Sequence, residues 1–231
     1  MIRVRPIHHT AHPDEWRRLL EALGARLVIE NGSWREYDTA SGTIAVSAAP
    51  DESVLGFTAT DLDAVLHRAI EAGVEAARTD EGPAGAIRVT AASGVSFLID
   101  ETYRGPLDVP GGPAVLQIWY QSDAAEMRRV YTAMGLRPRI VSDDPGGWAD
   151  YAAPGGGLAA QHPAADVRVD ATAFEYAGDL DALAERVRRA GIEASIIDEA
   201  YNRTLLVDSP DGGKVWVNGV QEDLYGYHRA D

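Results

Sequence analysis

The sequence contains no cysteine, which excludes disulfide bonds, thiolate-ligated metal sites and a cysteine nucleophile. It also lacks any apolar run of membrane-spanning length, and its N-terminal segment has no apolar core of the kind found in signal peptides. A phosphate-binding loop, a nucleophile elbow and a recognisable catalytic triad are absent as well. We therefore expect a cytoplasmic protein that does not use these chemistries.

Positive charge is scarce relative to negative charge, with 21 Lys and Arg against 36 Asp and Glu, a net charge of -15. Phosphate backbones are bound by clustered basic residues, so this balance argues against a nucleic-acid partner. It is compatible with a cationic ligand, although most acidic surfaces serve only solubility. The remaining expectation is a small-molecule ligand, with neither nucleic acid nor membrane as partner.

An internal repeat organises the chain. Residues 61–100 and 179–218 align without gaps and agree at thirteen of forty positions. The matches include Asp61 with Asp179 and Gly73 with Gly191, at the expected start and end of a helix. Matches at caps and turns indicate a duplicated structural unit.

The same order of elements, one strand, one helix and three strands, occurs four times in the 231 residues. Each helix carries one apolar stripe and ends at a glycine, namely Gly24, Gly73, Gly135 or Gly191. Units one and two predict a first domain over residues 1–102, and units three and four a second over 114–220. A Pro- and Gly-rich linker over 103–113 separates them, and residues 221–231 have the composition of a polar tail.

The segments DLDALAERVRRAGIEA and DSPDGGKVWVN resemble the second helix and final hairpin of the vicinal oxygen chelate superfamily, which includes glyoxalase I, bleomycin-resistance proteins and extradiol dioxygenases. The resemblance extends from about Arg3 to Asn218. It implies an α+β fold of four βαβββ units in two tandem glyoxalase-like domains, with curved mixed sheets and helices packed outside. It also implies a small-molecule cleft, and a monomeric pseudo-dimer or a homodimer.

Metal-dependent members of that superfamily take ligands from the first and last strands of their units. In the final hairpins the expected Glu is replaced by Leu98 and Trp216, neither of which can ligate a metal. The ligand positions on the first strands map near Arg5, Val54, Leu116 and Ala171 or Thr172. Only Gln161 and His162 remain as plausible donors, and one or two donors do not make a metal site. The sequence therefore predicts that the metal site is lost and that no cofactor is bound.

Aromatic and polar residues near the same strands offer a different site. Trp216 alternates with Val215 and Val217, so it faces the cleft if the valines face the helices. Trp34 and Trp148 recur at equivalent positions and are interpreted as core. The predicted ligand-binding residues are Trp216, Glu175, Tyr176, Trp119, Tyr120, Gln161 and His162, where only one of Trp119 and Tyr120 is expected to point inward.

Three functions remain open from the sequence. The first is a metal-independent protein of the glyoxalase and bleomycin-resistance type that sequesters a planar or cationic compound. The second is a metal-dependent lyase, isomerase or dioxygenase, whose donors would be His9, Gln161, His162 and Glu175. The third is an interaction module whose clefts are filled by its own side chains.

Overall fold

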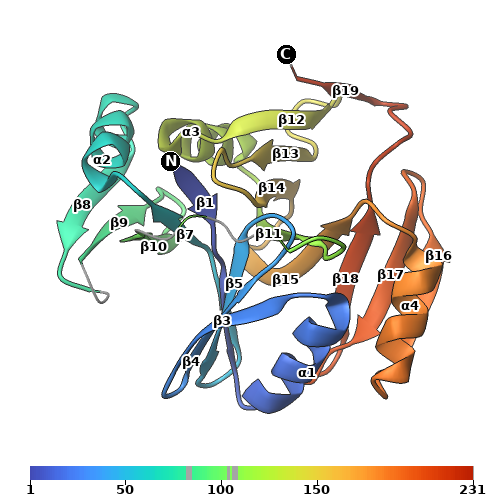
Figure 1. The fold of residues 1–231 in the computed structure, drawn as a ribbon. Coiled ribbons are helices and arrows are strands. Elements are labelled where there is room, and N and C mark those ends of the chain that lie inside the picture. The colour runs from blue at the N-terminus through green and yellow to red at the C-terminus, as the bar shows by residue number, and fades with distance from the viewer. Residues whose placement is uncertain (82–84, 103–104, 106–108, 231) are drawn as a thin grey trace.

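The computed structural model describes residues 1–81, 85–102, 105 and 109–230, and within these ranges the predicted order of elements recurs four times (Figure 1). The first unit contains β2 (Ile7–Thr10), α1 (Pro13–Leu23), β3 (Arg26–Asn31), β4 (Trp34–Asp38) and β5 (Thr43–Ala48), preceded by β1 (Ile2–Val4). The second contains β6 (Glu52–Val54), β7 (Gly56–Ala59), α2 (Leu62–Glu71), β8 (Glu75–Thr79), β9 (Ala86–Thr90) and β10 (Ser96–Glu101).

The third unit contains β11 (Ala114–Gln121), α3 (Ala124–Met134), β12 (Arg137–Ser142), β13 (Ala149–Ala152) and β14 (Leu158–Pro163). The fourth contains β15 (Arg168–Tyr176), α4 (Leu180–Arg189), β16 (Ala194–Asp198), β17 (Arg203–Asp208) and β18 (Lys214–Gly219), and β19 (Tyr227–Arg229) follows it. Of the predicted linker over 103–113, residues 103–104 and 106–108 lie outside the described residues.

The helices begin and end for local reasons that the sequence indicated. The Asp61, Asp123 and Asp179 carboxylates accept hydrogen bonds from backbone N–H groups in the first turns of α2, α3 and α4. The glycine behind α1, Gly24, has φ 97°, and its counterpart Gly135 behind α3 has φ 97°. Side chains other than glycine rarely adopt this left-handed conformation, so the glycines end these helices.

Strand pairing joins the units two by two. In the second half, β11 and β15 pair antiparallel and link units three and four into one sheet of order β16-β17-β18-β15-β11-β14-β13-β12-β19. In the first half the corresponding pairs are β2 with β6 and β1 with β7, which belong to two five-stranded sheets. The first strand of unit one is therefore divided into β1 and β2. Pro6 lies at the break and has no N–H to donate to a ladder.

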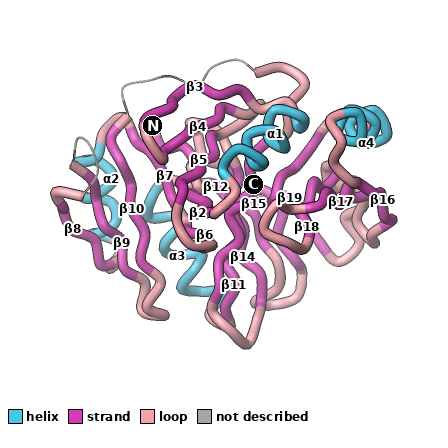
Figure 2. Tube along the Cα trace, turned by 90° about the horizontal axis from the view of Figure 1, so that it is seen from below, coloured by secondary structure: helices cyan, strands magenta, loops and turns pink. Residues whose placement is uncertain are grey.

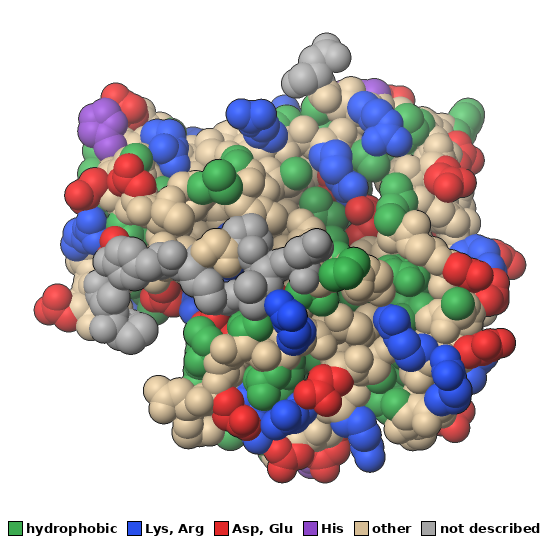
Figure 3. Space-filling view, in the orientation of Figure 1, with side chains coloured by type: hydrophobic (Ala, Val, Ile, Leu, Met, Phe, Trp, Pro, Cys, Tyr) green, Lys and Arg blue, Asp and Glu red, His purple; other side chains and the backbone are tan. Residues whose placement is uncertain are grey.

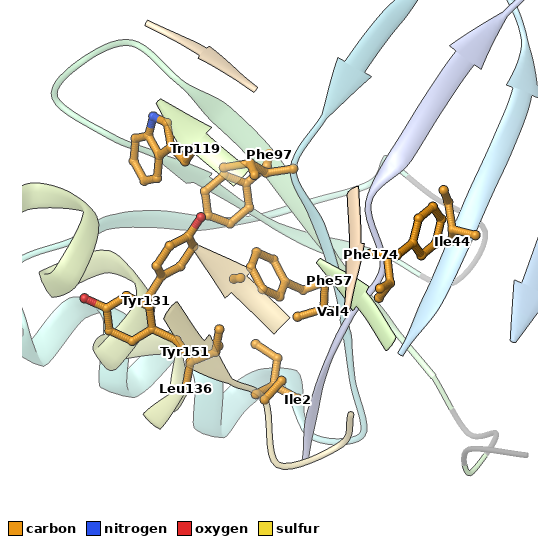
Figure 4. Close-up of a cluster of buried hydrophobic side chains, with 14 of the residues drawn as sticks. Ile2, Val4, Ile44, Phe57, Phe97, Trp119, Tyr131, Leu136, Tyr151 and Phe174 are labelled. Carbon is orange, nitrogen blue, oxygen red and sulfur yellow. The ribbon is translucent and has the colours of Figure 1, made fainter. Parts of the chain in front are cut away.

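The helix-covered faces of the two halves meet in one hydrophobic core. The α2 helix contacts α3 and the α1 helix contacts α4, as Figures 1 and 2 show from two directions. Between them, Phe57 of β7 lies edge-on to Tyr131 of α3, with ring centroids 6.3 Å apart. Figure 4 shows these side chains packed with Phe97, Trp119 and Tyr151, residues that come from both halves. The other faces of the sheets point away from this core.

Charged side chains of both signs are interspersed over the face drawn in Figure 3. The net charge of -15 therefore does not gather into one acidic patch on that face. Among the described residues, the helices are too short or too polar to cross a membrane.

Candidate functional site: an aromatic cavity in the second half

A cavity of about 330 Å³ opens on the face of the second-half sheet that points away from the helices. Its floor is apolar, formed by Leu116 and Ile118 of β11 and Ala173 of β15. Five aromatic side chains also line it: Tyr120, Trp148, Tyr201, Trp216 and Tyr227. The remaining lining residues are polar or glycine, namely Asp150, His162, Asp170, Glu175, Asn218, Gly219 and Gln221.

The predicted alternation in β18 agrees with the structure. Val215 and Val217 are buried on the helix side, whereas Trp216 lines the cavity and is 39% exposed. The indole therefore presents an accessible flat surface to any molecule in the cavity. Trp148, interpreted from the sequence as core, is only partly buried and lies on the cavity wall.

Strand register decides which of the other predicted residues reach the cavity. The parallel pairing of β11 with β14 places Trp119 opposite Gln161 and Tyr120 opposite His162. Because successive side chains face opposite sides of a sheet, each pair lies together on one face. Tyr120 and His162 line the cavity, with ring centroids 5.1 Å apart.

Trp119 and Gln161 instead face the helices. Trp119 is fully buried and lies edge-on to Tyr131, and Gln161 accepts a hydrogen bond of 3.0 Å from the Tyr151 hydroxyl. Tyr176 also packs against the main core, outside the cavity lining. Four of the seven predicted residues are therefore brought together at the cavity, and these three are not.

An ionic cluster that the sequence did not reveal lies against the cavity. Arg139 of β12 donates to both oxygens of Asp150, at 3.0 and 2.7 Å, and to both oxygens of Glu175, at 2.8 and 2.6 Å. Burial disfavours the charged guanidinium, but its hydrogen bonds to these two carboxylates prevail and raise the pKa of Arg139. The guanidinium is thus permanently charged and fixed in place by two bidentate pairs.

The cavity carries net negative charge. Three of its lining residues are carboxylates, Asp150, Asp170 and Glu175, and Arg139 supplies one positive charge against them. Counting these four groups gives -3 + 1 = -2, and including Arg168 beside the lining Tyr120 gives -3 + 2 = -1. Arg168 stacks on the Tyr120 ring at 3.9 Å, but it lines a neighbouring cavity instead of this one. A positively charged ligand would therefore be favoured here over an anion.

The last residues of the chain complete the cavity wall. The sequence was interpreted as a polar tail over 221–231, but β19 pairs antiparallel with β12 and forms the ninth strand of the sheet. Gln221 and Tyr227 line the cavity from this segment. Its strand character was not predicted because three residues are too few to show a period.

The described residues of the first half contain a second arginine cluster. Arg5 donates to Glu36 at 2.8 Å and pairs with Asp100, and its guanidinium lies 5.3 Å from the Trp34 ring centroid. Trp34 and Glu36 occupy the places of Trp148 and Asp150, so the two halves share a Trp-x-acid pattern with an arginine. That recurrence was the sequence signal that could have indicated Asp150.

The side chains that line the cavity do not match the set of metal ligands expected for this fold. The first-strand positions facing it are Leu116, Ile118 and Ala173, and the last-strand position of unit four is Trp216, none of which can ligate a metal. The last strand of unit three offers one donor, His162. Ala173 takes the place expected for Ala171 or Thr172, because a bulge between Leu116 and Ile118 shifts the register of β15. The carboxylates of Asp150 and Glu175 are both engaged by Arg139.

No protein-family model matches the sequence, and no curated protein matches it. Several solved structures do match this chain in fold. A catechol 2,3-dioxygenase aligns over 95% of this chain and 92% of its own, at 16% identity and a TM-score of 0.64. A Mn(II)-bound glyoxalase from Novosphingobium aromaticivorans aligns over 96% and 82%, at 15% identity and a TM-score of 0.66.

A third structure, the 2,2',3-trihydroxybiphenyl 1,2-dioxygenase of Sphingomonas wittichii, aligns over 98% of this chain and 93% of its own, at 13% identity and a TM-score of 0.62. At these identities the likeness establishes the fold and leaves the activity open. The α+β arrangement of four βαβββ units expected from the sequence is confirmed.

Proposed function

We propose that this chain, which has the fold of the vicinal oxygen chelate superfamily, binds a planar cationic small molecule in the cavity of its second half without a metal. The observation that carries the proposal is the lining itself: aromatic walls, net negative charge, and apolar side chains at the strand positions that would hold a metal.

Size and chemistry support a drug-sized ligand. Small-molecule pockets have volumes of roughly 300–1,000 Å³, and about 330 Å³ is at the lower end of that range. Trp and Tyr faces attract cations through their quadrupoles and stack on flat rings, with contributions of about 0.5–2 kcal/mol for each cation contact. Trp216 and Trp148 offer such faces, and Asp170 and Glu175 supply charge complementarity.

A matched pair of dyes tests this proposal. Proflavine is planar and cationic, and acridine-9-carboxylate has the same ring system with an anionic group. We expect proflavine to bind with 1:1 stoichiometry in isothermal titration and to quench tryptophan fluorescence, and the carboxylate to bind at least tenfold more weakly. Equal affinity for the two dyes, or no binding of proflavine, would contradict the proposal.

Substitutions locate the dye. Trp216→Ala should weaken proflavine binding about tenfold, in line with the loss of one stacked cation–π contact. Tyr225→Ala is the matched control, since Tyr225 is 92% exposed and does not line the cavity. If both variants bind like the unaltered protein, the dye is bound elsewhere and the proposed site is wrong.

A metal-dependent lyase, isomerase or dioxygenase is the second candidate, favoured by the likeness to dioxygenases and to a Mn(II)-bound glyoxalase. Of its four predicted donors, His162 and Glu175 line the cavity, Gln161 faces the core, and His9 belongs to β2 in the first half. If this candidate is right, His162→Ala with Glu175→Gln abolishes both metal retention and turnover of catechol.

The division into domains at 1–102 and 114–220, the cytoplasmic location, and the choice between monomeric pseudo-dimer and homodimer stay predictions. Light scattering coupled to size exclusion distinguishes a chain of 24.8 kDa from a dimer of twice that mass.

A further inference from the structure

A second cavity, of about 400 Å³, lies where the first half meets the turn between β17 and β18. Most of its lining is polar. It includes His8, Asp51 and Ser53 from the first half, and Asp170, Ser209 and Asp211 from the second. The sequence did not single out this place, because its parts are separated by as many as 203 residues.

Asp211 is held rigidly at the inner end of this cavity. One of its oxygens accepts from Thr10 Oγ1 at 2.5 Å, and the other accepts from Trp16 Nε1 at 2.5 Å and lies 2.8 Å from His8 Nε2. A carboxylate offers about four acceptor positions, so these three contacts leave capacity for one more partner. The turn residue is thus fixed against β2 and α1 of the other half.

His8 supplies a nitrogen ligand to the same place. The residue is 4% exposed, and its ring lies tilted by 57° against Trp16 with centroids 4.5 Å apart. Its Nε2 lies 2.8 Å from the Asp211 carboxylate, so Nε2 is the ring nitrogen that faces the cluster. An ion that displaces the hydrogen shared by these two atoms would have both of them as adjacent ligands. The opposite ring nitrogen, Nδ1, is buried and has no hydrogen-bond partner among the described residues.

Asp51 completes a set of three. One ligand atom from each of His8, Asp51 and Asp211 lies within 4.8 Å of the others. In the described part of the chain, neither carboxylate forms an ion pair with Lys or Arg, as the salt bridges of Asp211 involve His8 alone. Lys214 and Arg168 line the cavity, but Lys214 pairs with Asp208 and Arg168 stacks on Tyr120.

Among the described residues, two other carboxylate pairs in this protein are each bridged by an arginine, and the pair formed by Asp51 and Asp211 is not. Glu36 with Asp100, and Asp150 with Glu175, are each bridged by one guanidinium. Asp51 and Asp211 are brought together in the same way without a guanidinium between them. Two carboxylates held this close without a cation repel each other, so the site is suited to a bound cation.

We propose that His8, Asp51 and Asp211 bind a divalent transition-metal ion, of the Zn²⁺ or Mn²⁺ class, at the junction between the two halves. One imidazole and two carboxylates form the mixed nitrogen and oxygen set that these ions accept. Three protein ligands leave coordination positions open toward the cavity. The ion would tie β2 and the loop after β5 to the turn between β17 and β18.

This site is separate from the aromatic cavity but shares a wall with it. Tyr120 and Asp170 line both cavities, whereas His8, Asp51 and Asp211 line only the second. Metal binding here is therefore compatible with metal-free ligand binding in the first cavity, and the two proposals can fail independently.

The test uses tag-free full-length protein that has been treated with chelator and dialysed. Zn²⁺ and Mn²⁺ are added separately, and bound metal is measured by elemental analysis and isothermal titration. We expect one equivalent of Zn²⁺ per chain. Asp51→Asn should lower the affinity at least tenfold, and because Asp51 is exposed this variant should fold normally. Glu52→Gln is the matched control, an exposed neighbour outside the site.

Retention of one Zn²⁺ that is lost in Asp51→Asn and kept in Glu52→Gln supports the proposal. Absence of stoichiometric binding of either ion, or equal binding by the two variants, overturns it. Glu175→Gln separates the sites, since it should leave Zn²⁺ binding unchanged. If Glu175→Gln removes the metal and Asp51→Asn does not, the ion belongs to the aromatic cavity, and the metal-free function proposed above fails instead.

Discussion

Arg68 of α2 and Arg186 of α4 occupy the same position of the internal repeat, and each donates to the carboxyl end of a helix in the opposite half. Arg186 bonds the carbonyl oxygens of Ala22 and Leu23 at 2.8 and 2.6 Å, and Arg68 bonds that of Met134 at 3.2 Å. The last carbonyls of a helix lack intrahelical partners and carry partial negative charge, so a guanidinium stabilises them.

Removing these arginines should cost unequal amounts of stability. Arg186→Ala loses two short charge-assisted hydrogen bonds, and we expect the free energy of unfolding to fall by about 2–3 kcal/mol. Arg68→Ala loses one longer bond and should cost about 1 kcal/mol. Urea denaturation measures both. The interpretation is wrong if Arg68→Ala is the more damaging change.

Arg139 should be more important for stability than its exposure suggests. Arg139→Met leaves Asp150 and Glu175, whose side chains are 5% and 14% exposed, without their shared cation. Uncompensated buried charge of this kind costs about 3 kcal/mol. Adding Glu175→Gln to Arg139→Met should recover part of the loss, as thermal unfolding would show.

Arg137→Met is the control for that series. Arg137 lies on the same strand, is exposed, and forms no ion pair among the described residues. A change at an exposed site of this kind is expected to stay within about 0.5 kcal/mol. If Arg139→Met lowers the free energy of unfolding no more than Arg137→Met does, the two bidentate pairs contribute little to stability.

Alkaline pH should destabilise the protein through Tyr131. Burial raises the pKa of this hydroxyl well above 10.0, so the folded protein keeps it neutral while the unfolded chain ionises it. The stabilising contribution is full below pH 10 and is lost as the pH rises above it, by about 1.4 kcal/mol per pH unit. Urea midpoints at pH 8 and pH 11 measure the loss.

Tyr131→Phe removes the titrating group and should therefore lose less stability between pH 8 and pH 11. Tyr225→Phe should keep the full loss, because that side chain is 92% exposed and contributes no such difference. Identical slopes for both variants would show that other groups control alkaline unfolding.

Deleting residues 221–231 should weaken ligand binding more than stability. Among the described residues, the deleted segment pairs with the edge of β12 and bonds to Asp143 next to it, and it carries Gln221 and Tyr227 of the cavity lining. We expect proflavine affinity to fall at least fivefold, with the circular dichroism spectrum preserved. Tyr227→Ala alone should reproduce part of that fall, and full affinity in the truncated chain would exclude the segment from the site.

Local patterns predicted much of this structure because local physics decides helix ends and strand faces. The glycine caps, the aspartate N-caps and the alternation of Val215, Trp216 and Val217 all depend on near neighbours in the chain. They appear in the structure as expected, with Gly24 and Gly135 as caps and with Gly73 and Gly191 at positive φ one residue after the caps of α2 and α4. The outward-facing Trp216 is the clearest case, since two buried valines fix its direction.

The first strand of unit three, β11, is a case in which local sequence patterns could not predict the structure. Gln117 and Gln121 are both fully or almost fully buried, so polarity could not indicate which face of β11 meets the cavity. Their contacts come from other elements: the Gln117 side-chain oxygen accepts from the Gly56 N–H at 3.1 Å, and Gln121 donates to Glu126 of α3 at 3.0 Å. The Arg139 cluster likewise joins three strands, and His8 meets Asp211 across the whole chain.

The shared core has a consequence for how this duplication can change over time. Phe57 and Tyr131 come from different halves and pack against each other. The helix pairs α1–α4 and α2–α3 each also combine one helix from either half. A half cut free at residue 114 would expose its largest apolar surface to water. Whatever specialisation the second half acquires, the first half must be inherited with it as a covering surface.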